Sequence, residues 1–167
     1  VLPVWPFKES APEISAEVPM IMGTTQNEFV TGINNPKAMS MTEAALRERV
    51  ERAYPGRTEA IIAAFKETAP QAKPFELWSR IATGPIRAAA IQQAKLKASL
   101  KKAPAYLYEF TWQTPILDGR PMAFHCADIP FVLFNTDRCD TMSGGGADAR
   151  ALSLSIGPLM RLRHLPR

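Results

Sequence analysis

A chain of 167 residues has the length of one domain and is long enough to bury a sizeable core. With 46% hydrophobic and 22% charged residues, it has the composition of a folded protein, which excludes global disorder. The net charge is +4, but the lysines and arginines are scattered and have no interleaved aromatic residues, which argues against nucleic-acid binding. No apolar run is long enough to span a membrane. Fifteen prolines favour short elements and loops over a coiled coil or a plain helical bundle.

The first predicted strand lies near the N-terminus. Residues 1–17 are rich in proline and polar side chains and predict an extended surface segment. The apolar run Val18–Gly23 follows it. Such a run is typical of a strand buried on both faces of a parallel sheet, and Pro19 and Gly23 leave it too short for a buried helix.

Four helices are predicted next. Ser40 and Glu43 have the spacing of a capping box at the start of the first, whose apolar stripe is Leu46, Val50 and Ala53. Pro74 and Pro85 suit the first turns of the last two helices. The second, third and fourth helices are expected at Thr58–Thr68, Phe75–Thr83 and Ile86–Lys102.

A second strand is predicted at Pro104–Trp112, where aromatic residues alternate with mixed ones. A strand, several helices and another strand form an α/β unit, so we expect an α/β fold. Further along, Ser143–Gly146 predicts a flexible loop before a helix that begins near Ala147.

Two residues with catalytic potential follow the two predicted strands. Glu28 comes five residues after Gly23, and His125 lies on a loop shortly after the second strand. Parallel strands bring such loops to one sheet edge, so the two side chains can meet. The carboxylate would then fix the imidazole tautomer, and the other ring nitrogen would take a proton from a serine hydroxyl. The alternative is a solvated glutamate and a packed loop histidine.

Three blocks of the chain, in this order, carry a family resemblance: Val18–Phe29, Ala105–Phe110 and Phe124–Val132. They resemble type B carboxylesterases, the cholinesterase-related family that includes the bacterial para-nitrobenzyl esterases. The resemblance covers residues 1 to about 152. It implies the C-terminal portion of an α/β-hydrolase fold, a mostly parallel sheet flanked by helices, with Glu28 as the triad acid and His125 as the triad base. It implies a small carboxylic ester as substrate, and neither a cofactor nor a metal.

The chain departs from that family in two ways. No serine has glycine two residues before and two after it, so the Gly-x-Ser-x-Gly nucleophile is expected upstream, because such chains run nucleophile, acid, histidine. Residues 153–167 lack the family's later features and form an atypical tail, which a truncation or a frame shift would explain. We therefore expect residues 1–152 to be the C-terminal part of a catalytic domain that needs its N-terminal part and is inactive alone.

Two other functions are weighed against this one. A non-catalytic, esterase-like interaction domain would have no need of Glu28 and His125, and both are present. A metal site built from His125, Cys126, Cys139 and His164 would have adjacent ligands and poor zinc spacing. Two cysteines make no disulfide framework, so they do not decide between a cytoplasmic and a secreted protein.

Overall fold

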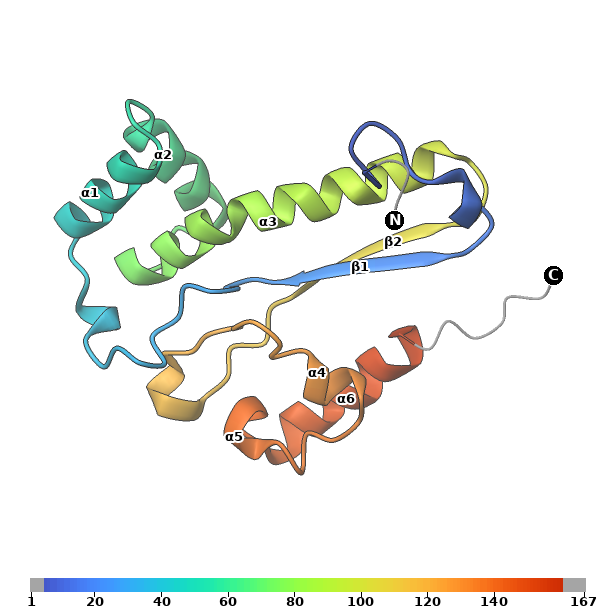
Figure 1. The fold of residues 1–167 in the computed structure, drawn as a ribbon. Helices are drawn as coiled ribbons and strands as arrows, with labels where there is room; N and C mark the ends of the chain where they lie inside the picture. Colours follow the sequence, from blue (N-terminus) through green and yellow to red (C-terminus); the bar gives the residue numbers. More distant parts are fainter. Residues whose placement is uncertain (1–4, 161–167) are drawn as a thin grey trace. The chain divides into compact units, whose positions relative to one another are not determined.

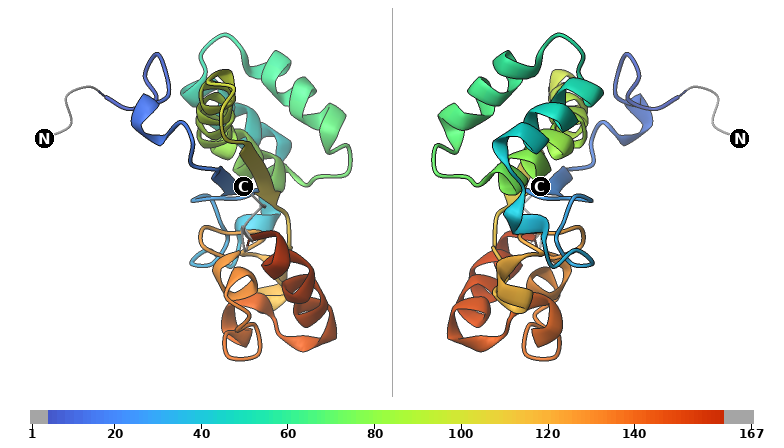
Figure 2. Two further views of the ribbon diagram at one scale, coloured as in Figure 1. Left: turned by 90° about the vertical axis from the view of Figure 1, so that its right-hand side faces the viewer. Right: turned by 90° about the vertical axis from the view of Figure 1, so that its left-hand side faces the viewer.

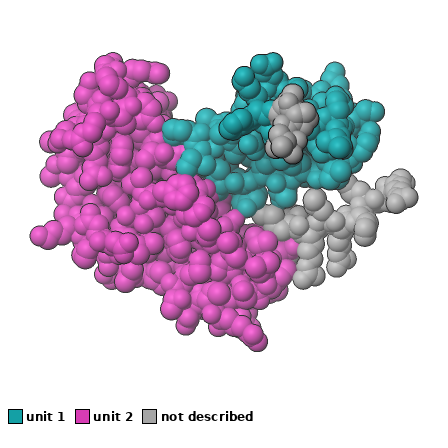
Figure 3. Space-filling view, in the orientation of Figure 1, with its two compact units in different colours: residues 1–24, 84–109 teal, residues 25–83, 110–167 magenta. Residues whose placement is uncertain are grey.

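A computed structural model describes residues 5–160 of the chain, and side chains through residue 157 (Figure 1). The described residues form two compact units, and each unit is made of separate stretches (Figure 3). Unit 1 contains residues 5–24 and 84–109, and unit 2 contains residues 25–83 and 110–160. The elements run in the order η1 (Glu13–Ser15), β1 (Met20–Thr25), η2 (Ala38–Ser40), α1 (Glu43–Ala53), α2 (Thr58–Thr68), α3 (Pro74–Ser99), β2 (Ala105–Phe110), η3 (Ile116–Gly119), α4 (Ile129–Val132), α5 (Asp140–Ser143) and α6 (Gly146–Met160).

The sheet consists of β1 and β2, which pair in parallel. The later part of α3 runs beside the strands in unit 1 (Figure 1). The Arg87 guanidinium on this helix donates hydrogen bonds to the backbone oxygen of Tyr108 at 2.8 Å and to Oγ1 of Thr24 at 3.3 Å. One cation therefore ties the helix to both strands.

The predicted strands are confirmed, with β1 beginning two residues later than expected. The expectation that the first strand is buried on both faces is wrong for this chain. Met22, Thr24 and Thr25 are buried, but Met20 and Ile21 are only half-buried and Gly23 is exposed. Two strands cannot bury each other on both faces, since a parallel sheet relies on layers of helices for that. The chain is thus a mixed helix and strand fold with a small parallel sheet.

A buried lysine holds η1 against α3 within unit 1. Lys97 is almost wholly buried, and its ammonium donates to the backbone oxygens of Ser15 and Ala16, the latter at 2.9 Å. A buried ammonium has to be hydrogen-bonded, because desolvation without partners is costly. Each of these oxygens also accepts a backbone N–H, that of Ser15 from Val18 at 3.1 Å and that of Ala16 from Ala103 at 3.0 Å, so the ammonium adds to bonds already present.

The start of α1 differs from the predicted capping box. Thr42 has an extended backbone and its Oγ1 accepts a hydrogen bond from the Ala45 N–H at 3.2 Å, so Thr42 is the N-cap. Ser40 instead belongs to the short helix η2 and donates to the Lys37 carbonyl. The prediction of Ser40 as the cap was wrong because η2 already occupies that residue.

The helices α1 and α2 pack on the first turns of α3 around one apolar cluster in unit 2 (Figure 1 and Figure 2). The buried residues of this cluster are Leu46, Val50, Ile62, Leu77 and Ile81. The predicted bounds of the second helix are confirmed, as are two residues of the first helix's apolar stripe. Its third predicted member, Ala53, is exposed in the last turn of α1, where the chain already leaves the helix.

Charged side chains hold the α1–α2 hairpin together on its exposed side. Arg47 bonds Glu59 of α2 at 2.9 Å, and this hydrogen bond and charge raise the pKa of Arg47. The Glu51 carboxylate accepts from the Thr58 hydroxyl at 2.6 Å and from the Gly56 N–H at 3.0 Å. These two donors lower the pKa of Glu51, so its bonds are formed at neutral pH and lost as the carboxyl protonates in acid.

The two helices expected on either side of Pro85 are one continuous helix, α3. A proline inside a helix removes a hydrogen bond and crowds the preceding turn, which is why the sequence predicts a break. Side chains on both sides of it are anchored, Leu77 and Ile81 in the apolar cluster and Lys97 on the carbonyls after η1. These contacts favour a continuous helix over the local preference of Pro85.

Three C-terminal helices pack together in unit 2 (Figure 1 and Figure 2). Phe131 of α4 and Ala149 of α6 are fully buried, and the Ser153 hydroxyl donates to the Phe131 carbonyl at 2.8 Å. The helix expected near Ala147 is confirmed as α6, and the residue 152 boundary proposed from the sequence lies inside it. In the part of the chain that the structure describes, no helix combines the length and the hydropathy needed to cross a membrane.

The apolar cluster predicts the effect of a core truncation. Leu46→Ala removes a side chain with 0% exposure and leaves a cavity, so we expect about 2–5 kcal/mol less unfolding free energy. Urea unfolding followed by the fluorescence of the adjacent Trp78 measures this change. The matched control Leu154→Ala, at a residue 61% exposed, should change the value by less than about 0.5 kcal/mol. Equal effects of the two substitutions would contradict the assignment of the core.

Candidate functional site

The two residues singled out in the sequence lie side by side in unit 2. Nδ1 of His125 is 2.7 Å from Oε2 of Glu28, a short charge-assisted hydrogen bond. The Glu28 residue is 7% exposed, whereas the His125 side chain is 52% exposed. The pair therefore joins a buried acid to a base that solvent can reach.

Backbone pairing beyond the strands brings the two residues together. A parallel bridge joins Asn27 to Phe124, with the Asn27 N–H donating to the Ala123 oxygen at 3.0 Å. The His125 backbone N–H then donates to the backbone oxygen of Glu28 at 2.9 Å. Residues 28 and 125 are thus bonded through both their backbones and their side chains. This pairing is the convergence of loops at a parallel sheet edge that the sequence predicts.

The Asn27 side chain fixes this bridge from inside. Its Oδ1 accepts from the Ala123 N–H at 3.2 Å, and its Nδ2 donates to the Ser79 hydroxyl of α3 at 3.0 Å. Ser79 in turn donates to the backbone oxygen of Val30. Asn27 is 1% exposed, so each of these bonds replaces water that the buried amide has lost.

Both oxygens of the Glu28 carboxylate have donors. Oε1 accepts from the Thr25 N–H at 2.8 Å, and Oε2 faces the His125 ring. The Glu28 backbone N–H donates to the Thr83 hydroxyl at 3.1 Å. These hydrogen bonds fix the direction of the carboxylate before any substrate binds.

The other ring nitrogen of His125, Nε2, belongs to a half-exposed side chain. Within the described residues, Nε2 has no hydrogen-bond partner, while the Phe29 ring lies beside the imidazole. When Nδ1 carries the ring proton and donates it to Glu28, the neutral ring has a lone pair on Nε2. That arrangement allows the ring to accept a proton from a nucleophile and to return it later.

The sequence predicted the acid and the histidine but not the residues that support them. Asn27, Ser79 and Thr83 are buried polar residues that hold the Glu28 loop on α3. Ser79 and Thr83 are four residues apart and so share one helix face. Two hydroxyls at this spacing within a predicted helix were the available signal, although such residues are more often solvent-exposed.

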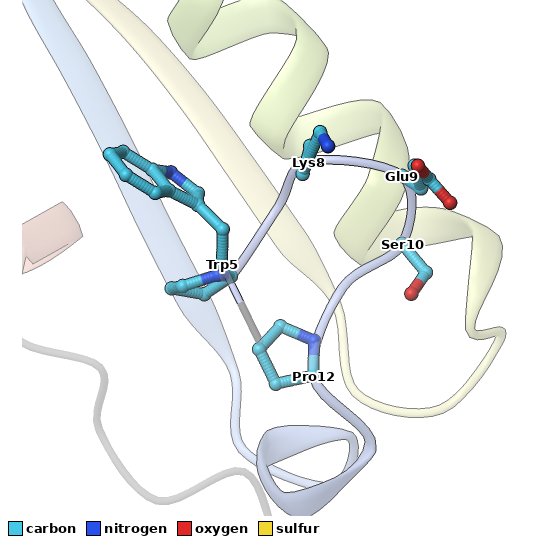
Figure 4. A pocket seen from close by; sticks show the side chains of 6 residues that line it. Trp5, Lys8, Glu9, Ser10 and Pro12 are labelled. Atoms are coloured by element: carbon cyan, nitrogen blue, oxygen red, sulfur yellow. The ribbon is translucent and has the colours of Figure 1, made fainter. Parts of the chain in front are cut away.

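Three cavities are lined by described residues other than Glu28 and His125. One of them, of about 370 Å³, belongs to unit 1 and is lined by Trp5, Pro6, Lys8, Glu9, Ser10 and Pro12 (Figure 4). A smaller one, of about 140 Å³, belongs to unit 2 and is lined by Gln26, Asn27, Glu76, Arg80, Gln113 and Met122. Asn27 therefore precedes Glu28 in the chain and also lines this small cavity.

A comparison with protein-family models and with curated proteins finds no match for this chain. The esterase resemblance therefore rests on the three sequence blocks alone.

Cys126 and Cys139 are free thiols. Among the described residues no three His, Cys, Asp or Glu side chains are grouped to hold a metal ion, and His164, the fourth ligand considered from the sequence, lies outside those residues.

The amide of Asn27 predicts a measurable stability effect. Asn27→Ala leaves the buried Ala123 N–H with one partner fewer and the Ser79 hydroxyl without its donor, so we expect a loss of about 1–3 kcal/mol in unfolding free energy. Urea unfolding measures it. Asn34→Ala, at an exposed position in the same unit, is the control and should be nearly neutral. A neutral Asn27→Ala variant would show that the amide network does not stabilise the bridge.

Proposed function

We propose that this chain is the C-terminal part of a serine carboxylesterase, in which Glu28 and His125 are the acid and the base of a catalytic triad. The observation that carries the proposal is the 2.7 Å contact between Glu28 and Nδ1 of His125, whose Nε2 has no hydrogen-bond partner among the described residues. The three sequence blocks that resemble type B carboxylesterases support it independently. The alternative of a solvated glutamate fits poorly with a carboxylate that is 7% exposed and bonded at both oxygens.

The proposed reaction follows from the roles of the two side chains. Nε2 of His125 takes the proton of a serine hydroxyl as that oxygen attacks the ester carbonyl, and the imidazolium returns the proton to the leaving alcohol. Water activated by the same nitrogen then hydrolyses the acyl-enzyme and releases the acid. Glu28 keeps the Nδ1 proton in place and stabilises the imidazolium. The proton transfers need no cofactor or metal.

The fold that accompanies this function is the C-terminal portion of an α/β-hydrolase domain. In it, β1 and β2 would join further parallel strands, and residues 1–152 would belong to the catalytic domain. The nucleophile and the oxyanion hole would come from a preceding segment. The half-exposed imidazole is compatible with this arrangement, because a serine has to approach Nε2 within hydrogen-bond distance. Residues 153–167 would be an atypical end of the domain.

The coding DNA upstream of the Val1 codon gives the most direct test. In the same frame we expect a Gly-x-Ser-x-Gly motif that follows an apolar strand, because a triad of this chain order has its nucleophile first. A frame that closes without the motif, or one with another residue in place of the serine, would leave Glu28 and His125 as remnants. The non-catalytic interaction domain would then be the better account.

Substitutions in the complete enzyme test the two roles separately. His125→Ala should lower kcat by about 10⁶, and Glu28→Gln, which keeps the shape but loses the charge, by about 10⁴. Hydrolysis of a small chromogenic ester measures both. Glu67→Gln, at an exposed glutamate of α2, is the matched control and should leave kcat unchanged. A loss of less than tenfold for His125→Ala would refute the assignment.

A further inference from the structure

An exposed phenylalanine lies against the ring of His125. The ring centroids of Phe29 and His125 are 4.4 Å apart, and the two planes are inclined by 37°. Phe29 is 69% exposed, whereas Phe110 and Phe131, which also make ring contacts in unit 2, are buried. Phe29 therefore contributes little to the core, and its described ring contact is with the imidazole.

The contact restrains a motion that the Glu28 hydrogen bond leaves free. A bond at Nδ1 fixes one edge of the imidazole, but the ring can still tilt about the line from Nδ1 to Oε2. With half of the His125 side chain exposed, the protein interior does not hold the ring in one plane. A neighbouring ring at 4.4 Å covers part of one face and limits this tilt.

The same contact favours the charged ring. An imidazolium near an aromatic face is attracted to the negative potential of that face, and the attraction is absent for the neutral ring. In the proposed reaction His125 becomes positive when it takes the serine proton. An interaction that strengthens at that stage lowers the barrier without tightening the binding of substrate.

We propose that Phe29 is a positioning residue for His125, holding the imidazole plane so that Nε2 points to the nucleophile and stabilising the imidazolium. Its catalytic consequence rests on the proposed esterase function. The ring contact itself does not, so the two can be tested apart.

The first experiment examines the ring in the 167-residue chain by ¹⁵N NMR of labelled histidine. The chain has two histidines, so a His164→Gln variant assigns the signals of His125. Phe29→Leu should shift and broaden the ring signals of His125, because the ring then samples more orientations. Phe29→Tyr should restore them. Leu154→Ala, which also removes an exposed apolar side chain, should leave them unchanged. Unchanged His125 signals in Phe29→Leu, with backbone amide signals intact, would overturn the proposal.

The second experiment measures ester hydrolysis by the complete enzyme. Phe29→Leu should lower kcat about tenfold with KM unchanged, since misorientation of a catalytic group affects the chemical step, and Phe29→Tyr should recover most of the rate. A raised KM with unchanged kcat would overturn the proposal, because Phe29 would then only contact substrate. If Phe29→Leu alters the ring signals but His125→Ala leaves hydrolysis unchanged, the esterase function fails and the positioning of the ring by Phe29 stands.

Discussion

The site depends on a short stretch of parallel backbone pairing beyond the ends of the two strands. Asn27 pairs with Ala123, and His125 pairs with Glu28, through hydrogen bonds of 3.0 and 2.9 Å. Register is strict in such pairing, since a slip of one residue turns every side chain to the opposite side. Only in the observed register do the Glu28 carboxylate and the His125 ring meet. Every other feature of the site, including the contact with Phe29, follows from this register.

The supporting polar network makes this short pairing durable. Two backbone hydrogen bonds alone stabilise the pairing little. Each replaces hydrogen bonds to water, so its net contribution to stability is only about 1 kcal/mol. Asn27 adds a side-chain bond to Ala123 and a second to Ser79, and Thr83 bonds the Glu28 backbone. All of these groups are buried, so breaking one leaves an unpaired polar atom away from water, which costs more than the bond itself contributes.

The helix α3 links this network to the apolar core of unit 2. Leu77 and Ile81 of α3 pack against α1 and α2. Ser79 and Thr83 of the same helix bond the loop that carries Glu28. A helix held by buried apolar contacts is a rigid support, and sites built on rigid elements keep their geometry better than sites on loops alone. The acid is therefore buried and fixed, whereas the base is exposed on one side and is restrained by Glu28 and by the ring of Phe29.

The sequence by itself determined the features that depend on neighbours along the chain. The bounds of α2, the inward positions Leu46 and Val50, both strands and the start of α6 follow from apolar periodicity and from proline and glycine positions, which act locally. The Glu28–His125 contact could also be predicted, because parallel strands bring their following loops to one edge.

Only the tertiary structure decided the features that depend on residues far apart in sequence. The continuity of α3 through Pro85 requires contacts on both sides of the proline. The bonds of Asn27 to Ser79 and Ala123 span 52 and 96 residues. No local pattern encodes such a pairing, because a polar side chain in a helix or loop can form its hydrogen bonds with water as readily as with a distant residue. Its burial and its partners are set when the elements pack.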